Sequence, residues 1–232
     1  MEKSRLQQAH DLYNNGDYEE AFSVYSELAK EGDPDAQTSL AYMYQQGQGC
    51  EKDEARAREL YEKAVEKKQP YALFNLAVWY ANGKGGLERN PFKAYELFLE
   101  AAVAGIPRAQ YEVAVMSERG NGTPQNYSEA AYWYEEAAKR GDIEAFNNLG
   151  VLYKEGLGVA QDYRRAFVCF DRAAAQNLAT AQYNLGLLYD HGLGVEMDHE
   201  KALELCRNAA YQGHSKAKEV IRKLQEDGKI VF

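Results

Sequence analysis

A repeat of 36 residues runs through most of the chain and limits its possible folds more than any other feature does. Five segments align without gaps: AQTSLAYMYQQGQG (36–49), ALFNLAVWYANGKG (72–85), AQYEVAVMSERGNG (109–122), AFNNLGVLYKEGLG (145–158) and AQYNLGLLYDHGLG (181–194). Their first residues lie 36, 37, 36 and 36 positions apart. A period of this length indicates one small structural unit that is stacked on copies of itself.

Each repeat has the apolar spacing of two amphipathic α-helices. In the first segment, Ala36, Leu40, Ala41 and Tyr44 fall on one face of a helix. A second segment follows with the same kind of spacing in every repeat: ARELYEKAV (57–65), AYELFLEAA (94–102), AAYWYEEAA (130–138), AFVCFDRAA (166–174) and ALELCRNAA (202–210). The sequence therefore predicts a helix pair in each repeat.

A Gly-x-Gly motif stands between the two segments of each repeat and is predicted to be the turn between the helices. A phosphate-binding glycine loop is expected once, after a strand, whereas this motif recurs five times and no strand pattern is visible. The second helices are expected to begin after a side chain that caps their first turn: Asp53, Asn90, Asn126, Asp162 and Asp198. Residues that tolerate a left-handed backbone mark the ends of these helices: Gly32, Gly105, Gly141, Asn177 and Gly213.

The two ends of the chain differ from the repeats and are predicted to be caps. Ala21 comes only five positions after Gly16, which is typical of a shorter, tetratricopeptide-like helix pair. We therefore expect a single repeat domain made of a capping pair (1–33), five repeats (34–69, 70–106, 107–142, 143–178 and 179–214), and a capping helix with a tail (215–232).

Composition and charge narrow the classes of function. The chain has 36 acidic and 27 basic residues and a net charge of −9, which argues against nucleic acid as a partner. No apolar run is long enough to span a bilayer, so no membrane insertion is expected. The three cysteines form no CxxC motif, and together with the start of the chain they favour a cytoplasmic protein without a cofactor. We favour a monomer.

The repeat pattern A-x-x-x-L-G-x-x-Y-x-x-G-x-G-V-x-x-D-x-x-x-A is complete in residues 145–166 and 181–202. It resembles the Sel1-like repeat family, over about residues 34 to 216, with tetratricopeptide-like ends. The resemblance implies an all-α protein, a right-handed α/α superhelix (solenoid) of antiparallel helix pairs that acts as an adaptor or scaffold for other proteins. The family also includes immunity proteins to secreted toxins and bacterial members described as penicillin-binding.

Several residues suggest chemistry, but each also has a structural interpretation. Cys50, Cys169 and Cys206 occupy positions where the other repeats carry apolar side chains, which favours buried structural thiols. His191 and His199 could join Cys206 in a zinc site, yet no fourth ligand completes the set, so no metal is expected. Ser215-Lys216-Ala217-Lys218 matches the SxxK motif of penicillin-recognising enzymes, but the companion SDN and KTG motifs are absent.

A second stripe along the first helices is the predicted partner surface. If these helices line the inside of the superhelix, the stripes form one concave face, on which one position varies freely as Thr38, Phe74, Tyr111, Asn147 and Tyr183. Exposed aromatic side chains are common binding anchors. The residues expected to bind are Tyr42, Tyr71, Phe74, Arg108, Tyr111, Glu118, Glu144, Asn147, Lys154 and Tyr183. The convex face, the loops and the tail Ile230-Val231-Phe232 are the alternative surfaces.

The function expected from these features is a non-enzymatic adaptor that binds a protein or peptide in its concave groove. One alternative is a serine hydrolase or penicillin-binding activity through Ser215 and Lys218. Another is an immunity protein that blocks a secreted toxin. No catalytic triad or carboxylate pair is recognisable in the sequence.

Overall fold

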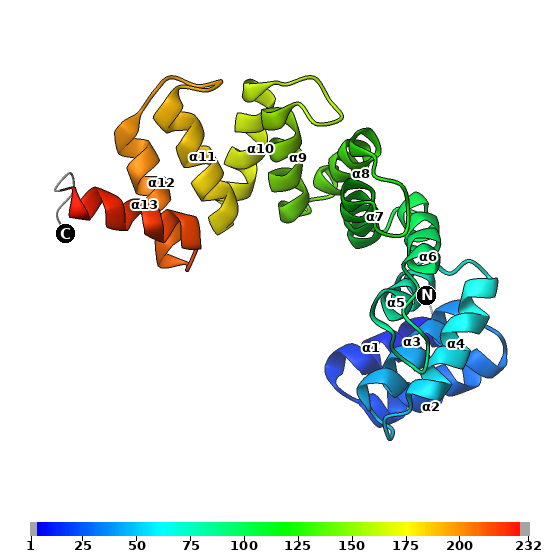
Figure 1. The fold of residues 1–232 in the computed structure, drawn as a ribbon. Helices are drawn as coiled ribbons and strands as arrows, with labels where there is room; N and C mark the ends of the chain where they lie inside the picture. The colour runs from blue at the N-terminus through cyan, green and yellow to red at the C-terminus, as the bar shows by residue number, and fades with distance from the viewer. Residues whose placement is uncertain (1–3, 228–232) are drawn as a thin grey trace. The chain divides into compact units, whose positions relative to one another are not determined.

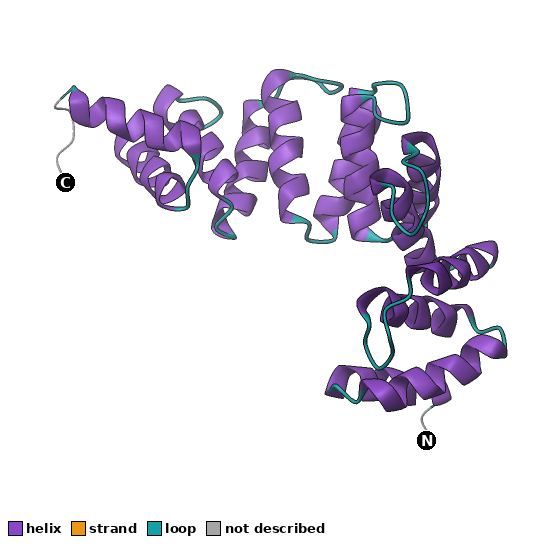
Figure 2. Cartoon of the chain, turned by 60° about the horizontal axis from the view of Figure 1, so that its bottom comes forward, coloured by secondary structure: helices purple, strands orange, loops and turns teal. Residues whose placement is uncertain are grey.

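The computed structural model describes residues 4–227, and within this range the chain is built from helices with no strand (Figure 2). It divides into two compact units. Unit 1 comprises the residues up to Val113 together with Asn121–Pro124, and unit 2 comprises Ala114–Gly120 and the residues from Gln125 onward. The predicted all-α solenoid of helix pairs is confirmed. The tail Ile230-Val231-Phe232 lies outside the described residues.

Unit 1 contains the N-terminal helix pair and the first two repeats (Figure 1). Its helices are α1 (Arg5–Asn15), α2 (Tyr18–Lys30), α3 (Pro34–Gln46), α4 (Glu54–Glu66), α5 (Pro70–Asn82) and α6 (Pro91–Val103). The boundary between the units falls within α7 (Pro107–Arg119). In this helix Ser117 stands where the other repeats have tyrosine.

Unit 2 contains the remaining helices (Figure 1). They are α8 (Tyr127–Lys139), α9 (Ile143–Glu155), α10 (Tyr163–Ala175), α11 (Ala179–His191), α12 (His199–Tyr211) and α13 (Ser215–Glu226). Helix α8 is the second helix of the repeat that begins with α7, and it is followed by two further pairs and the single helix α13. Each of the ten repeat helices, α3 to α12, is 13 residues long. Equal helix lengths allow each pair to pack on the next one in the same register.

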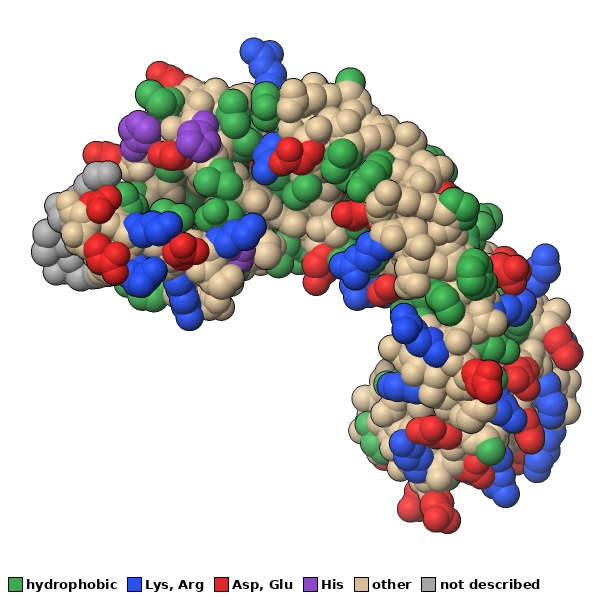
Figure 3. Space-filling model, in the orientation of Figure 1, with side chains coloured by type: hydrophobic (Ala, Val, Ile, Leu, Met, Phe, Trp, Pro, Cys, Tyr) green, Lys and Arg blue, Asp and Glu red, His purple; other side chains and the backbone are tan. Residues whose placement is uncertain are grey.

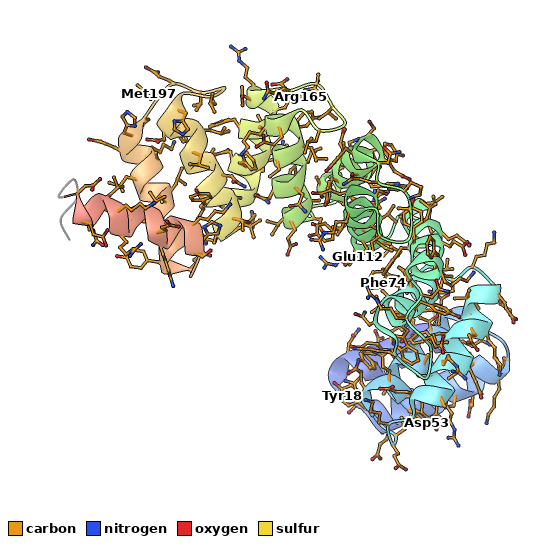
Figure 4. The ribbon with its side chains drawn as sticks, in the orientation of Figure 1. Tyr18, Asp53, Phe74, Glu112, Arg165 and Met197 are labelled. Atoms are coloured by element: carbon orange, nitrogen blue, oxygen red, sulfur yellow. The ribbon has the colours of Figure 1, made fainter. Side chains whose placement is uncertain are left out.

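The predicted capping residues begin the second helices as expected. Asp53, labelled at the start of α4 in Figure 4, accepts a hydrogen bond from the backbone N–H of Arg56 at 3.0 Å. The same bond forms at Asn90, Asn126, Asp162 and Asp198. These side chains satisfy N–H groups that have no partner within the helix. The five capping assignments are confirmed.

The Gly-x-Gly motif joins the two helices of each repeat, and its second glycine also sets the contact with the preceding repeat. Gly158 has φ +69°, and a Cβ atom there would overlap the backbone of Tyr127 and Ser128 at the start of α8. Its carbonyl oxygen accepts a hydrogen bond from Ser128 Oγ at 2.8 Å. Gly194 meets the start of α10 in the same way. The motif therefore serves close packing between consecutive repeats.

One position in the second helices carries a buried aromatic ring in five of the helix pairs. Tyr61, Tyr134 and their counterparts in other helix pairs carry an aromatic ring that is at most 2% exposed: Tyr25, Tyr61, Phe98, Tyr134 and Phe170. The buried hydroxyl groups have partners, because Tyr61 donates to Gln45 Oε1 at 3.1 Å and Tyr134 donates to Glu118 Oε2 at 2.5 Å. In the last repeat the equivalent residue is Cys206.

Buried glutamines provide a second link between consecutive pairs. Gln37 Nε2 donates to the carbonyl oxygen of Ala29 at 3.3 Å, and Gln110 Nε2 donates to that of Ala102 at 3.2 Å. Each accepting carbonyl belongs to the last turn of the preceding second helix, where carbonyl groups lack helical partners. The recurrent Ala-Gln pair at the start of the first helices thus joins one repeat to the next.

The end of α4 has neither the glycine nor the asparagine that is predicted to follow the other second helices. Lys68 follows this helix with φ +55°, whereas the predicted residues follow the other second helices: Asn177, with φ +60°, and Gly32, Gly105, Gly141 and Gly213. A residue with a Cβ atom pays a steric cost in this conformation. Sequence inspection missed Lys68 because neither glycine nor asparagine marks the site.

Replacing Lys68 with glycine is expected to raise the free energy of unfolding by about 0.5 to 1 kcal/mol, because glycine adopts positive φ without steric cost. The control is Glu59→Gly, at an exposed position in the middle of α4, which should lower the free energy of unfolding by about 1 kcal/mol. Urea denaturation followed by circular dichroism measures both changes. A loss of stability in the Lys68 variant would contradict this explanation.

Candidate functional site

In unit 1, two of the predicted partner-binding tyrosines are strongly exposed. The side chain of Tyr42 on α3 is 40% exposed and that of Tyr71 on α5 is 60% exposed. Apolar residues of the same two helices, such as Leu40 and Leu76, are at most 6% exposed. The two tyrosines therefore present rings to solvent from helices whose other face forms the core.

The starts of α3 and α5 are joined by a side-chain hydrogen bond. Gln69 caps α5 by accepting from the N–H of Ala72 at 2.6 Å, and its Nε2 atom donates to Asp35 Oδ1 of α3 at 3.0 Å. Asp35 and Tyr71 occupy equivalent positions in consecutive repeats. This bond shows that the stripes of the two helices lie next to each other in unit 1.

Phe74 is less exposed to a binding partner than the sequence suggested. Its ring centroid lies 5.6 Å from that of Phe98 on α6, and the side chain is partly buried. Figure 4 labels Phe74 on α5. Packing against a core ring gives Phe74 a structural role, so substitutions there would affect stability as well as binding.

The predicted residues of α7 interact with their own neighbours. The guanidinium carbon of Arg108 lies 4.6 Å from the centroid of the Tyr111 ring. Arg108 also pairs with Glu112, one turn further along the helix, at 3.2 Å. Figure 4 labels Glu112. Glu118, in the part of α7 that belongs to unit 2, accepts the hydroxyl hydrogen bond of Tyr134.

In unit 2, the structure separates one predicted residue from the others. Asn147 is only 9% exposed, and its amide is engaged within the unit: Nδ2 donates to Asn148 Oδ1 and Oδ1 accepts from Asn184 Nδ2, at 3.1 and 3.0 Å. Asn147 therefore contributes to the packing of α9 against α11. We correct the expected surface by removing Asn147 from it.

The remaining predicted residues of unit 2 stay accessible to different degrees. Glu144 is exposed near the start of α9. Lys154, near the end of that helix, pairs with Glu155 at 2.9 Å. Tyr183 on α11 is half-buried, with its ring centroid 4.7 Å from the ring of His214 and an angle of 32° between the rings. Tyr183 thus lies at the edge of the C-terminal helices rather than free in solvent.

A cavity of about 570 Å³ opens beside Tyr183 between α11, α12 and α13. Gly186, Leu187 and Asp190 line it from α11, Cys206 from α12, and Val220 and Leu224 from α13. His199 also lines it, with Nδ1 at 2.8 Å from Asp190 Oδ1. Figure 3 shows hydrophobic side chains between the histidines and the charged side chains of the C-terminal part. The sequence signal for this cavity was the cysteine at the aromatic position.

The cysteines are structural, as expected from the repeat. All three are free thiols; Cys169 and Cys206 are buried and Cys50 is partly buried. Burial raises the pKa of the Cys169 thiol to about 11, and burial together with the charge of Asp190 raises the pKa of Cys206. Both thiols stay protonated at neutral pH and pack as small apolar groups.

Among the residues that it describes, the structure does not arrange the histidines into a metal site, and it leaves the SxxK residues exposed at the start of α13. His191 and His199 both approach Asp190, at 3.8 and 2.8 Å, and residues 4–227 contain no group of three His, Cys, Asp or Glu side chains arranged to hold a metal ion. Ser215 is the first residue of α13 and Lys218 follows one turn later, and both side chains are exposed.

Within the described residues, no helix combines the length and the apolar character that crossing a bilayer requires.

The comparison with protein families identifies these repeats. The model of the Sel1 repeat matches residues 34–68, 70–105, 107–142, 143–178 and 179–214. The chain belongs to the Sel1 repeat family. Sel1 repeats generally serve protein interaction and regulation. The matched segments begin with the first helix of each pair, in agreement with the helix bounds.

Two curated relatives that share a similar segment are named as regulators. A chitin synthase regulator of Saccharomyces cerevisiae is 30% identical over 118 residues, which cover 50% of this chain and 17% of the yeast protein. A negative regulator of exopolysaccharide production from Rhizobium leguminosarum bv. viciae is 33% identical over 129 residues, covering 49% of this chain and 48% of that protein. The chain thus spans less than half the length of either relative.

Two solved structures share the Sel1 fold along nearly the whole chain. A Sel1 repeat protein from Oxalobacter formigenes is 30% identical with a TM-score of 0.85, covering 96% of this chain and 88% of that one. A protective antigen of uropathogenic Escherichia coli strains is 30% identical with a TM-score of 0.88, covering 97% of this chain and 49% of that one.

Proposed function

We propose that this Sel1 repeat protein is a non-enzymatic adaptor that binds a protein or peptide through the first-helix surface of unit 1, defined by Tyr42, Tyr71 and Phe74. The observation that carries the proposal is the exposure of the Tyr42 and Tyr71 rings on neighbouring helices whose opposite faces are buried. Exposed aromatic rings supply contact area with few rotatable bonds, which makes them effective binding anchors.

The chemistry around these rings favours a polypeptide as the partner. The carboxylate of Asp35, at the start of α3, accepts a hydrogen bond from Gln69, two residues before the exposed ring of Tyr71, so this surface has both a carboxylate and aromatic rings. Polypeptides match such surfaces with side chains of both kinds, and a typical interface combines apolar anchors with a polar rim. Regulation is also the role named for two relatives, the chitin synthase regulator and the exopolysaccharide regulator, which supports an adaptor.

In unit 2, we propose that Glu144, Lys154 and Tyr183 contribute contacts of a different kind. Glu144 and Lys154 carry opposite charges near the two ends of α9. Surface charges of this kind affect the rate and selectivity of association more than the affinity. We therefore assign the main binding energy to the aromatic rings, and no catalytic group is part of the proposed surface.

Site-specific photocrosslinking in the source cells tests this assignment. A photoreactive phenylalanine analogue at Tyr71 is expected to form a covalent adduct with the partner, which mass spectrometry then identifies. The matched control places the analogue at Phe92, a 69% exposed ring on the second helix α6 of the same unit. Equal crosslinking from both positions, or adducts from Phe92 alone, would contradict the proposed surface.

A further inference from the structure

The last repeat lacks an aromatic ring that fills the equivalent space in the preceding repeat. In repeat 143–178, the fully buried ring of Phe170 covers Gly150 so closely that a Cβ atom there would lie 2.7 Å from Cε1 of the ring. In repeat 179–214, the equivalents are Cys206 and Gly186. The atoms nearest to a Cβ on Gly186 belong to the α12 backbone and Leu205, at 3.1 Å or more, and include no ring.

The missing ring coincides with the cavity between α11, α12 and α13. Both Gly186 and Cys206 line it, and the Cys206 thiol turns towards α13, where its sulfur lies 3.7 Å from the carbonyl oxygen of Ala217. The cavity of about 570 Å³ lies within the usual size range of ligand sites, about 300 to 1,000 Å³. It is large enough for a ring and the chain that carries it.

The walls of this cavity also define the charge of a suitable ligand. Leu187, Val220 and Leu224 make most of the lining apolar. Asp190 supplies the carboxylate on the wall, and 46% of its side chain remains exposed despite the contact with His199. A basic group next to an aromatic ring would satisfy both features, because the ring replaces the missing one while the cation meets the carboxylate.

We infer that the cavity between α11, α12 and α13 binds an aromatic side chain of a partner polypeptide that has a basic residue next to it. This inference rests on the proposed function, since it names a second contact of a partner-binding protein. It assigns to unit 2 a pocket for one anchoring side chain, separate from the open surface of unit 1.

The experiment measures binding of N-acetyl-phenylalanyl-arginine amide to the purified full chain by two-dimensional NMR. Saturable shifts of the Gly186 and Cys206 amide signals are expected at millimolar peptide. N-acetyl-alanyl-arginine amide should bind at least tenfold more weakly, and N-acetyl-phenylalanyl-glutamate amide several-fold more weakly. Absence of saturable shifts, or equal affinity for the alanyl peptide, would overturn the inference.

Variants of the cavity residues then test where the aromatic ring and the arginine of the peptide bind. Cys206→Phe should abolish binding by filling the cavity from within, and Leu224→Trp on α13 does so independently if the first variant folds poorly. Asp190→Asn should remove the preference for arginine over glutamate. Tyr211→Ala, at a 78% exposed position on α12 outside the cavity, is the control that retains binding. Unchanged binding in both filled variants would contradict the assignment.

The last residue of the chain, Phe232, is also aromatic and is an alternative ligand for the cavity; it lies outside the described range. Deleting residues 228–232 should leave the peptide affinity unchanged if the pocket serves a partner. A tenfold gain would instead assign the pocket to this segment of the chain and overturn the inference. Because these measurements use purified protein and a defined peptide, their failure leaves the crosslinking test of Tyr71 unaffected.

Discussion

Gly158→Ala is expected to lower the free energy of unfolding by about 3 kcal/mol or more. Two costs combine at this site: a Cβ atom is strained at φ +69°, by about 1 kcal/mol, and the methyl group meets the backbone of Tyr127 and Ser128. Overpacking against a rigid neighbour typically costs a further 1 to 3 kcal/mol or so. Backbone at the start of α8 cannot move aside without disturbing the contact between the repeats.

Gly141→Ala separates these two costs. Gly141 belongs to the same unit and has φ +92°, but a Cβ atom there would meet no heavy atom within 4 Å. The expected loss is therefore only about 1 kcal/mol. Urea denaturation followed by circular dichroism compares the two variants directly. Equal losses would show that the second glycine of the turn is needed for its conformation alone and not for packing between repeats.

Phe170→Cys is expected to lower the free energy of unfolding by about 3 kcal/mol. The ring is fully buried over Gly150, and removing a buried aromatic ring costs about 3 to 5 kcal/mol when the surroundings cannot collapse. The variant gives repeat 143–178 the same pair, cysteine and glycine, that repeat 179–214 has naturally. It should therefore create a second cavity of the kind found beside Cys206.

The matched control for this variant is Val168→Cys on the same helix. Val168 is 52% exposed, so its replacement should change stability by no more than about 0.5 kcal/mol. Thermal and urea unfolding of both variants, with the wild type alongside, measure the difference. A loss of less than about 1 kcal/mol for Phe170→Cys would mean that the ring is not needed to fill this space and would weaken the cavity argument.

Most of the fold was predictable because local signals agree with one another in every repeat. The residue types that begin and end helices recur in one register, and Asp53 and Asp162 form the expected capping bonds. The exposed tyrosines of α3 and α5 were also identified from their place on a second stripe. A pattern that repeats five times leaves little freedom in the placement of its helices.

The features that sequence inspection missed depend on contacts between repeats. The burial of Asn147 follows from its bond with Asn184, 37 residues later, which helical periodicity does not reveal. The links made by Gln37 and Gln110 to the preceding helices have the same origin. Cys206 was placed correctly as an apolar residue, but only the neighbouring Gly186 and α13 show that its small side chain leaves a cavity.

The most direct test of the central claim is the affinity of the crosslinked partner for three purified forms of this protein, measured by calorimetry. The Tyr42→Ala/Tyr71→Ala variant should bind at least a hundredfold more weakly than the wild type, since buried aromatic anchors contribute about 2 kcal/mol or more each. The control, Phe92→Ala/Tyr132→Ala, removes two exposed rings from second helices and should bind like the wild type. An unchanged affinity of the Tyr42/Tyr71 variant, with its helical content retained, would contradict the account.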